Sequence, residues 1–231
     1  MARRVLIIGN SDGIGLAITK SLLGRGDEVV GVSRSPAPVS ANEFHHEVMD
    51  VTDPAYPALL ERLVSDVGPF DACIYCAGIA SPFTVPDLSG EAKVFDVNLT
   101  AMVRTLEHLT ASWVPRGKGH FIGLSSLADI LVNPDHPSYS ASKAGVSRYL
   151  TSMALRLRHE GVAVTNVRFG FVDTKMAKAV LRRPLMMSAE SAALRVICCL
   201  DTRPVQISVP RTVALFVGLA RVVQTIKIWK T

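Results

Sequence analysis

Short apolar runs alternate along the chain with segments whose apolar residues recur every three or four positions. The runs predict β-strands over 3–9, 28–33, 44–49, 71–76, 120–125, 162–168 and 205–209. The helical spacing predicts helices over 13–25, 53–68, 89–112, 138–160 and 189–200. Because strands that alternate with helices form right-handed βαβ units, the pattern predicts an α/β fold, a doubly wound parallel sheet in a single domain.

Individual residues predict where some of these helices begin and end. Asp53 and Pro54 predict the start of the second helix, because an aspartate caps a helix and a proline fits its first turn. Gly26, Gly68 and Gly161 predict helix ends. No repeat, low-complexity stretch or shift in composition marks a linker, so we expect one domain over residues 1–231.

The composition fits a self-sufficient core. The chain has 231 residues, of which 48% are hydrophobic and 6% aromatic. A chain of this length buries roughly 70% of its unfolded surface and needs no disulfide or structural metal. The composition excludes a collagen, a disordered tail and a disulfide-rich mini-protein. The net charge of +5 comes from scattered basic residues, so we expect no nucleic-acid partner.

The four cysteines predict no metal or redox site. Cys73 and Cys76 have CxxC spacing, but they lie in a predicted strand, where residues three apart point to opposite faces. Cys198 and Cys199 fit a packed helix better than a site. The apolar run from Val5 to Ile8 is too short for a secretory signal, so we expect a cytoplasmic protein with free thiols.

A glycine-rich loop joins the first strand to the first helix. It reads Gly9-Asn10-Ser11-Asp12-Gly13-Ile14-Gly15. Glycines at this place let the backbone approach a pyrophosphate at the positive end of the helix. The spacing GxxxGxG differs from the common GxGxxG fingerprint, so the loop alone is compatible with a phosphate cradle or with a tight turn.

Two further motifs point to proton transfer. Tyr139 and Lys143 lie four positions apart on a predicted helix and therefore share a face. An ammonium beside a phenol lowers the pKa of the phenol, which could then exchange a proton with a carbonyl or alcohol oxygen. Ser126 lies at the end of the fifth strand, where ligands bind in parallel α/β sheets. Each feature alone also fits a solvated pair or a turn serine.

In this order, the motifs resemble the short-chain dehydrogenase/reductase family, from Val5 to about Thr174. The glycine loop resembles its TGxxxGIG motif, with Ile8 in place of Thr. Further matching elements are Asp50-Val51 for the DV pair, Cys76-Ala77-Gly78 for NAG with Cys in place of Asn, Asn98, Ser126 thirteen positions before Tyr139, Tyr139-x-x-x-Lys143, and Phe169-Gly170-Phe171-Val172-Asp173-Thr174 for PGxVxT with Phe in place of Pro. The thirteen-residue spacing favours Ser126 over Ser125.

The resemblance implies a Rossmann-type sheet and a role for each residue. Tyr139 would be the general acid in reduction and the general base in oxidation, and Lys143 would lower its pKa and hold the nicotinamide ribose. Ser126 would polarise the substrate oxygen, and Asn98 would hold a water that relays protons. The implied cofactor contacts are Gly9, Ser11, Asp12, Gly13, Ile14, Gly15, Ser33, Arg34, Asp50, Val51, Cys76, Ala77, Gly78, Tyr139, Lys143, Gly170, Val172 and Thr174.

The end of the second strand indicates which dinucleotide binds. An acidic residue there accepts from the ribose 2′-hydroxyl of NAD, whereas a nearby arginine binds the 2′-phosphate of NADP. This chain has Ser33 followed by Arg34, which favours NADP(H) over NAD(H). Asp12 argues the other way, because family members that prefer NADP often carry a basic residue in the glycine loop.

Two late segments bear on substrate and partners. Residues 171–187 occupy the place of the family's substrate lid, and their methionines indicate an apolar carbonyl or alcohol, although a core stripe would look the same. Residues 210–230 predict a last helix that is too short in its apolar run to span a membrane. Its basic residues and Trp229 fit a membrane-surface helix, but we expect it to pack against the body or a second subunit.

We therefore predict an NADP(H)-dependent oxidoreductase that interconverts a carbonyl and a secondary alcohol through Ser126, Tyr139 and Lys143. The resemblance implies a homodimer or homotetramer formed through the helices that carry Asn98 and Tyr139. The alternatives are a catalytically silent NADP(H)-sensing protein on the same fold and a membrane-surface scaffold that uses the last helix.

Overall fold

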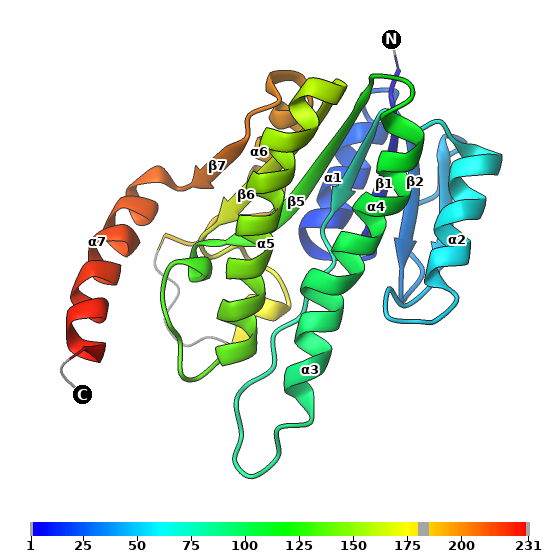
Figure 1. Ribbon diagram of the computed structural model, residues 1–231. Coiled ribbons are helices and arrows are strands. Elements are labelled where there is room, and N and C mark those ends of the chain that lie inside the picture. The colour runs from blue at the N-terminus through cyan, green and yellow to red at the C-terminus, as the bar shows by residue number, and fades with distance from the viewer. Residues whose placement is uncertain (1, 180–184, 230–231) are drawn as a thin grey trace.

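The computed structural model describes residues 2–179 and 185–229, in which seven parallel strands form one sheet (Figure 1). Their order is β3-β2-β1-β4-β5-β6-β7. The bounds are β1 Arg4–Ile8, β2 Glu28–Ser33, β3 Phe44–Val48, β4 Ala72–Tyr75, β5 Gly119–Ser126, β6 Val162–Phe169 and β7 Gln206–Val209. After β3 the chain crosses back to β4 beside β1, so the direction of winding reverses there. This confirms the predicted doubly wound, Rossmann-type sheet and creates a crevice between β1 and β4 where such folds bind ligands.

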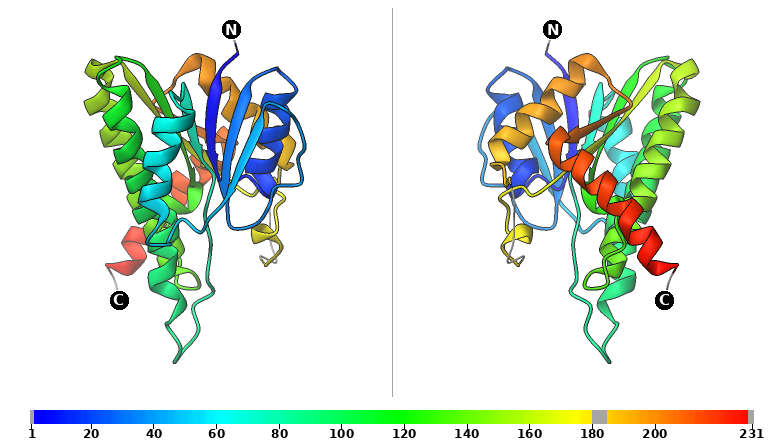
Figure 2. Two further views of the ribbon diagram at one scale, coloured as in Figure 1. Left: turned by 90° about the vertical axis from the view of Figure 1, so that its right-hand side faces the viewer. Right: turned by 90° about the vertical axis from the view of Figure 1, so that its left-hand side faces the viewer.

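Helices cover both faces of the sheet (Figures 1 and 2). Helices α1 and α6 pack on one face, and α2, α4 and α5 pack on the other. The bounds are α1 Gly13–Leu23, α2 Tyr56–Arg62, α3 Gly90–Phe95, α4 Ala101–Trp113, α5 Pro137–Leu157, α6 Ala189–Thr202 and α7 Arg211–Ile228. The single sheet and its two helical layers agree with one domain.

Each central strand contributes to two cores because its side chains alternate between faces. In β1, Leu6 and Ile8 join the core under α2, α4 and α5, while Val5 and Ile7 join the core under α1 and α6. Cys73 and Cys76 likewise lie on opposite faces, as predicted. Burial on both faces explains why the strands are continuous apolar runs in the sequence.

Two helices differ from their predicted form. Helix α2 begins at Tyr56 rather than Asp53, because the Asp53 carboxylate accepts from the Ala55 N–H at 2.8 Å in a turn before the helix. A π-helical turn at Leu63–Val67 extends α2 to Gly68. The predicted helix over 89–112 consists of α3, a π-helical turn at Asp96–Thr100 and α4. Such turns insert one extra residue and are frequent at functional sites.

Helix α7 contacts the body along one side only. None of its residues is buried, and it projects beside β7 away from the sheet (Figure 1). Of the two expected partners, the body covers little of the helix, and packing against a second subunit stays a prediction. Lys230, the end of the predicted segment, lies outside them. Among residues 2–179 and 185–229, no helix is long and apolar enough to cross a membrane.

Candidate active site

The glycine loop between β1 and α1 folds so tightly that side chains would not fit. Gly9 has a φ of +87°, and a Cβ on it would lie 2.6 Å from the backbone nitrogen of Ala77. A Cβ on Gly15 would lie 2.0 Å from the carbonyl oxygen of Gly9. The loop thus rests on the end of β4 and leaves backbone N–H groups at the start of α1. A cradle of this kind fits a phosphate-bearing dinucleotide.

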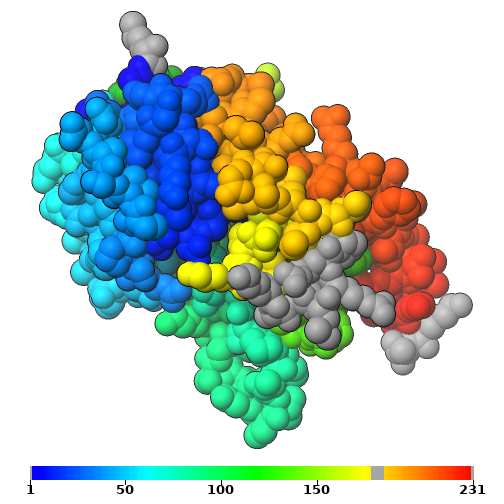
Figure 3. All heavy atoms as spheres, turned by 180° about the vertical axis from the view of Figure 1, so that it is seen from behind, coloured from blue at the N-terminus to red at the C-terminus, as the bar shows by residue number. Residues whose placement is uncertain are grey.

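The segment after β6 closes over this loop. Asp12 caps α1, because its Oδ1 accepts from the Gly13 N–H at 2.7 Å, and its Oδ2 lies 2.8 Å from Nζ of Lys175. A Cβ on Gly13 would lie 3.1 Å from Cγ2 of Thr174. In Figure 3 the yellow segment that follows β6 lies beside the blue N-terminal part of the chain. The structure therefore brings Thr174 to the loop, and the Asp12 charge is paired with a lysine that sequence reasoning assigned only to the lid.

The end of β2 carries the residues predicted to select the cofactor. Arg34 is exposed. The Ser33 hydroxyl donates to the Ser35 carbonyl at 2.9 Å, and Nε2 of His46 lies 2.9 Å from the same Oγ. Since a hydroxyl has one hydrogen, the His46 N–H donates to Ser33. His46, which the sequence analysis did not single out, therefore lies beside Ser33 at the end of β2. Its pairing with β2 could have been inferred only from the register of β3.

The predicted adenine pair, Asp50 and Val51, follows β3 on the same edge. Val51 is buried in the core, whereas the carboxylate of Asp50 accepts from the N–H and the hydroxyl of Thr52 at 2.9 and 2.8 Å. Burial raises the pKa of Asp50, but the Thr52 hydrogen bonds and the positive charges of Arg34 and Lys93 outweigh it and lower the pKa overall. The influence of Arg34 on the pKa of Asp50 shows that the two side chains lie near each other.

A second residue without a predicted role, Asn10, belongs to the glycine loop itself. Asn10 is fully buried, and neither polar atom of its side chain has a hydrogen-bond partner. A Cβ on Gly31 would lie 2.0 Å from Nδ2 of Asn10, so glycine in β2 makes room for this amide. Together with the cradle, this buried amide beside β2, whose polar atoms have no partner among the described residues, fits an adenine dinucleotide site.

The predicted catalytic residues meet at the end of β5 and the start of α5. The Ser126 side chain lies close enough to the Tyr139 phenol to lower its pKa. The Nζ of Lys143 lies 5.9 Å from the centre of the Tyr139 ring and donates to the Leu124 carbonyl at 2.8 Å. By contrast, the hydroxyl of Ser125 donates to the Lys143 carbonyl at 3.1 Å. Because strand side chains alternate, the two serines face different sides of the sheet, and the geometry agrees with the choice of Ser126.

The acid–base properties differ from the sequence expectation. Burial raises the pKa of Tyr139, a hydrogen bond from Ser126 opposes this, and the Asp129 carboxylate adds to the rise. Burial lowers the pKa of Lys143 to about 8, although the electrostatic influence of Cys76 and Asp129 raises it. The expectation that Lys143 brings the pKa of Tyr139 below 10 is therefore wrong for this structure, because desolvation dominates. The phenol stays protonated at neutral pH.

Asn98 occupies the π-helical turn between α3 and α4 and fastens the loop after β4. Its Oδ1 accepts from the Ile79 N–H at 2.8 Å, and its Nδ2 donates to the Ile79 carbonyl at 3.0 Å and to Oγ of Ser142 at 3.0 Å. A Cβ on Gly78 would lie 3.4 Å from Oδ1 of Asn98 and 3.5 Å from Nζ of Lys143. Three predicted residues thus converge, and glycine keeps the space between them open.

A buried ion pair beneath Tyr139 was not anticipated. The carboxylate of Asp129 lies 2.6 Å from Nη2 of Arg168 and also accepts from the Ser147 hydroxyl. Their side chains are only 4% and 14% exposed. Ser147 in turn contacts Ser125 at 2.8 Å, so the network reaches the strand that carries Ser126. In the sequence, Asp129 and Arg168 are 39 positions apart with no pattern that links them.

Cys76, which replaces the family's asparagine, is an apolar wall rather than a nucleophile. Burial raises the pKa of its thiol to about 12, although Lys143 opposes the rise.

In the segment after β6, Gly170 packs near Val209 and Pro210, and Val172 is buried. Val172 also pairs with Met187 in a parallel bridge that joins the two ends of the predicted lid. Residues 180–184 of that lid lie outside the described residues.

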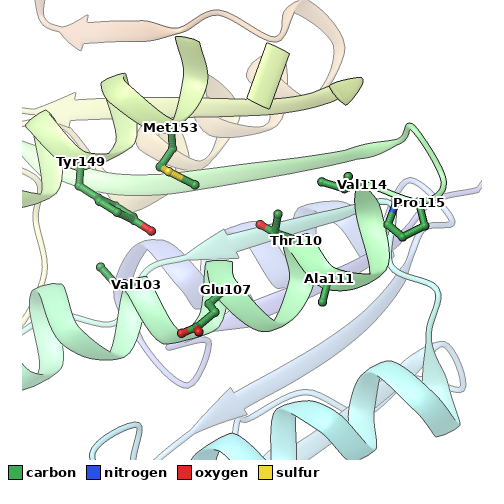
Figure 4. Close-up of a pocket in the computed structure, with 8 residues that line it drawn as sticks. All are labelled: Val103, Glu107, Thr110, Ala111, Val114, Pro115, Tyr149 and Met153. Carbon is green, nitrogen blue, oxygen red and sulfur yellow. The ribbon is translucent and has the colours of Figure 1, made fainter. Parts of the chain in front are cut away.

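An open hollow lies away from these residues, between α4 and α5 (Figure 4). It has a volume of about 500 Å³ and is largely apolar, with Glu107 and Thr110 as its polar side chains on α4. Tyr149 and Met153 close it from α5. The hollow shares no residue with the catalytic group, and it belongs to the outer surface of the two helices through which family resemblance implied association.

Comparisons with known proteins agree with this geometry. A family model described as short chain dehydrogenase matches residues 3–184. The chain is 29% identical over 184 residues to the 3-oxoacyl-[acyl-carrier-protein] reductase FabG of Vibrio cholerae, which covers 76% of this chain and 75% of that protein. It is 30% identical over 203 residues to an uncharacterized oxidoreductase of Myxococcus xanthus, covering 82% and 80%.

Solved structures agree with the fold. A short-chain dehydrogenase from Streptomyces avermitilis superimposes with a TM-score of 0.85 at 20% identity and covers 100% of this chain and 97% of its own. A structure described as ElxO with NADP bound gives a TM-score of 0.81 at 18% identity, over 90% of this chain and 97% of that one. The family match ends before α6, whereas the Streptomyces avermitilis structure also covers α6, β7 and α7.

Proposed function

The chain belongs to the short-chain dehydrogenase family and is an NAD(P)-dependent oxidoreductase, and we propose that it interconverts a carbonyl group and a secondary alcohol with NADP(H). The observation that carries the proposal is the convergence of Ser126, Tyr139 and Lys143, whose Nζ lies 5.9 Å from the centre of the Tyr139 ring, at the sheet edge that also holds the glycine loop. A buried, protonated phenol paired with a serine hydroxyl is suited to a single polar oxygen on a substrate. A silent cofactor sensor does not need this pair.

In the proposed reduction, Tyr139 donates its proton to the carbonyl oxygen while Ser126 donates a hydrogen bond to the same atom. The bound nicotinamide supplies the hydride. Lys143 lies behind the Tyr139 ring, and its ammonium stabilises the phenolate that remains after proton transfer. Asn98 holds the loop after β4 against α5, so that Gly78 and Lys143 keep their spacing.

The electrostatics favour reduction as the working direction. Burial and Asp129 raise the pKa of Tyr139, so the group is an acid rather than a base near neutral pH. The Vibrio cholerae relative is named a 3-oxoacyl reductase, which is a carbonyl reduction, and that name is compatible with this direction. The methionines at the lid ends, Met176 and Met187, suit an apolar carbonyl substrate.

The choice of NADP(H) over NAD(H) rests on the end of β2. No carboxylate occupies position 33 to repel a 2′-phosphate, and Arg34 is exposed beside it. The argument against NADP was Asp12, but its carboxylate is paired with Lys175. The proposed cofactor contacts are the glycine loop, Ser33, Arg34, Asp50, Val51, the strand end at Cys76, Ala77 and Gly78, and the segment with Gly170, Val172 and Thr174.

Two accessory features belong to the same proposal. The proposed substrate lid is the segment that begins and ends near the Val172–Met187 bridge, and its residues 180–184 lie outside the described residues. The chain assembles as a homodimer or homotetramer in which the apolar hollow between α4 and α5 is covered by the same surface of a second copy. The outward-facing Tyr149 and Met153 would be buried in that contact.

The test compares Tyr139→Phe with Tyr149→Phe, two variants of the same helix that each remove one phenolic hydroxyl. A panel of apolar ketones is reduced with NADPH, followed by nicotinamide absorbance, and NADPH binding is measured by fluorescence. We expect Tyr139→Phe to lose about 10²- to 10⁴-fold in turnover with cofactor affinity nearly unchanged. Tyr149→Phe should keep wild-type turnover.

Comparable turnover in Tyr139→Phe and wild type would contradict the mechanism. Tight NADPH binding by a wild type that reduces none of the carbonyls and oxidises none of the alcohols would support the alternative, a cofactor-sensing protein on the same fold.

A further inference from the structure

One side of α7 carries a row of large apolar side chains that are exposed. The helix touches the body along one side, where Val213, Val217 and Gln224 are half-buried. The side chain of Gln224 makes two hydrogen bonds to the backbone of Val132. Its Oε1 accepts from the Val132 N–H at 2.9 Å, and its Nε2 donates to the Val132 carbonyl at 2.7 Å. The large apolar side chains on the opposite side are exposed, and Figure 1 shows the helix extending away from the sheet.

That opposite side is a continuous apolar stripe. Its large side chains are between 52% and 85% exposed and comprise Leu215, Phe216, Leu219, Val222, Val223, Ile226 and Trp229. At 100° per residue they fall within an arc of about 140° on one side of the helix. Arg221 and Lys227 lie outside this arc, and Arg211 lies at its edge in the first turn. An apolar stripe of this size on a monomer marks an interaction surface.

The charge of the region is one-sided. From residue 202 to residue 231 the sequence contains five basic residues and no acidic one: Arg203, Arg211, Arg221, Lys227 and Lys230. An apolar face flanked by basic side chains, with a tryptophan near the end of the helix, is the composition of helices that lie flat in the headgroup region of a membrane. Each basic residue near an anionic bilayer adds attraction that depends on salt.

A second copy of α7 fits the stripe less well. Leu215, Leu219, Val222, Ile226 and Trp229 follow a four-three spacing like a coiled-coil seam. However, the flanking positions that would carry pairing charges hold Phe216, Gly218, Val223 and Thr225. Two such helices face to face would gather basic residues with no acidic partner. The charge pattern therefore selects an anionic lipid surface.

We propose that α7 binds flat on an anionic membrane surface through this stripe. The helix lies at the end of the molecule where the strands finish, and Gln224 ties it to the loop between Ser126 and Tyr139 (Figure 1). Val132 in that loop and Leu185 at the lid are also exposed apolar side chains, at 62% and 63%. If the proposed function holds, binding places the substrate opening at the lipid interface, where an apolar carbonyl compound is concentrated.

The test measures partition of the full chain into vesicles of phosphatidylcholine alone and of phosphatidylcholine mixed with phosphatidylglycerol. We expect binding to the anionic vesicles only, weakened by salt. Leu219→Glu, in the centre of the stripe, should weaken it at least about tenfold. Thr225→Glu adds the same charge on α7 outside the stripe and should cost much less. Because Trp113 is fully buried, a blue shift of fluorescence on binding reports Trp229.

Three results would overturn the proposal: no partition into anionic vesicles, equal partition by Leu219→Glu and wild type, or a wild-type oligomer that Leu219→Glu dissociates in sedimentation velocity. The last result would assign the stripe to a second copy. The measurement is independent of turnover, and Tyr139→Phe should bind vesicles as wild type does. A failure of the proposed reaction would therefore leave this result unaffected, and the reverse also holds.

Discussion

The buried carboxylate of Asp129 should set the pH range in which Tyr139 works. Its negative charge raises the pKa of Tyr139 and that of Lys143. Asp129→Asn removes the charge but keeps the size of the side chain and an oxygen that can accept from Arg168. Both pKa values should fall, and the positive charge left on Arg168 acts in the same direction.

The expected shift is about one pKa unit for Tyr139. At an effective dielectric constant of about 20, a carboxylate several ångströms away contributes on the order of 1–2 kcal/mol. About 1.4 kcal/mol corresponds to one unit. In reduction the phenol must be protonated, so the alkaline decline of kcat/KM should move to lower pH by about one unit. In oxidation, the rise of kcat/KM with pH should move by the same amount in the same direction.

The pH profile is measured alongside an ultraviolet titration of tyrosinate, with Tyr139→Phe as the blank, which needs no substrate. Asp135→Asn is the matched control, because Asp135 is an exposed carboxylate in the loop before α5. Removing one partner of a buried ion pair can cost about 3–5 kcal/mol, so thermal unfolding is followed for each variant. Arg168→Gln leaves Asp129 in place and should move both pKa values upward. An unchanged profile in Asp129→Asn, or shifts of the same sign in both variants, would refute the reasoning.

Three further changes have definite expected outcomes. Arg34→Ala should lower the affinity for NADPH by about ten- to a hundredfold and leave the affinity for NADH unchanged, both measured by fluorescence titration. If the control variant Arg25→Ala loses as much NADPH affinity, Arg34 makes no specific contact with the cofactor. His120, whose pKa burial lowers to about 3, binds a proton in the unfolded chain from about pH 6.5 downward. The wild type should therefore lose about 2 kcal/mol of unfolding free energy between pH 7 and 5, and His120→Gln should lose less in urea titrations. Gly9→Ala should lower the free energy of unfolding by about 1–3 kcal/mol and abolish NADPH binding. Gly26→Ala is the control: Gly26 has a similar φ of +80° but open space around it, so this variant measures the cost of the backbone conformation without a steric clash.

The sequence predicted the sheet well because burial on both faces leaves a strong signal. Continuous apolar runs such as Val5 to Ile8 occur only where both sides of a strand are covered, and all seven predicted strands are present. The start of α2 was misplaced because Asp53 can cap a helix or make a turn with equal local chemistry. The π-helical turn around Asn98 has no pattern of its own, since one inserted residue hardly alters a helical repeat.

Proximity between distant segments was the part that local patterns could not supply. The motif spacing located Ser126, Tyr139 and Lys143, and the strand ends brought them together. The ion pair of Asp129 with Arg168 and the contact of His46 with Ser33 depend on the register of neighbouring strands, which the sequence does not state. The sign of the Tyr139 shift was misjudged for a related reason: charge can be read from a pair of residues, but desolvation depends on everything that surrounds them.

The departures from the family pattern at Ile8, Cys76 and Phe169 can be understood from main-chain bonding. Ile8 and Phe169 are buried on opposite faces of the sheet, and neither side chain faces the crevice. The carbonyl of Ile8 accepts from the N–H groups of both Cys76 and Ala77, at 2.8 and 2.9 Å. These bonds join β1 to β4 whatever the side chains are, so the seat of the glycine loop survives the substitutions. Gly9, in contrast, cannot be replaced, because the lack of a side chain there lets the backbone of Ala77 approach. The loop therefore depends on its glycines but tolerates an apolar residue at position 8.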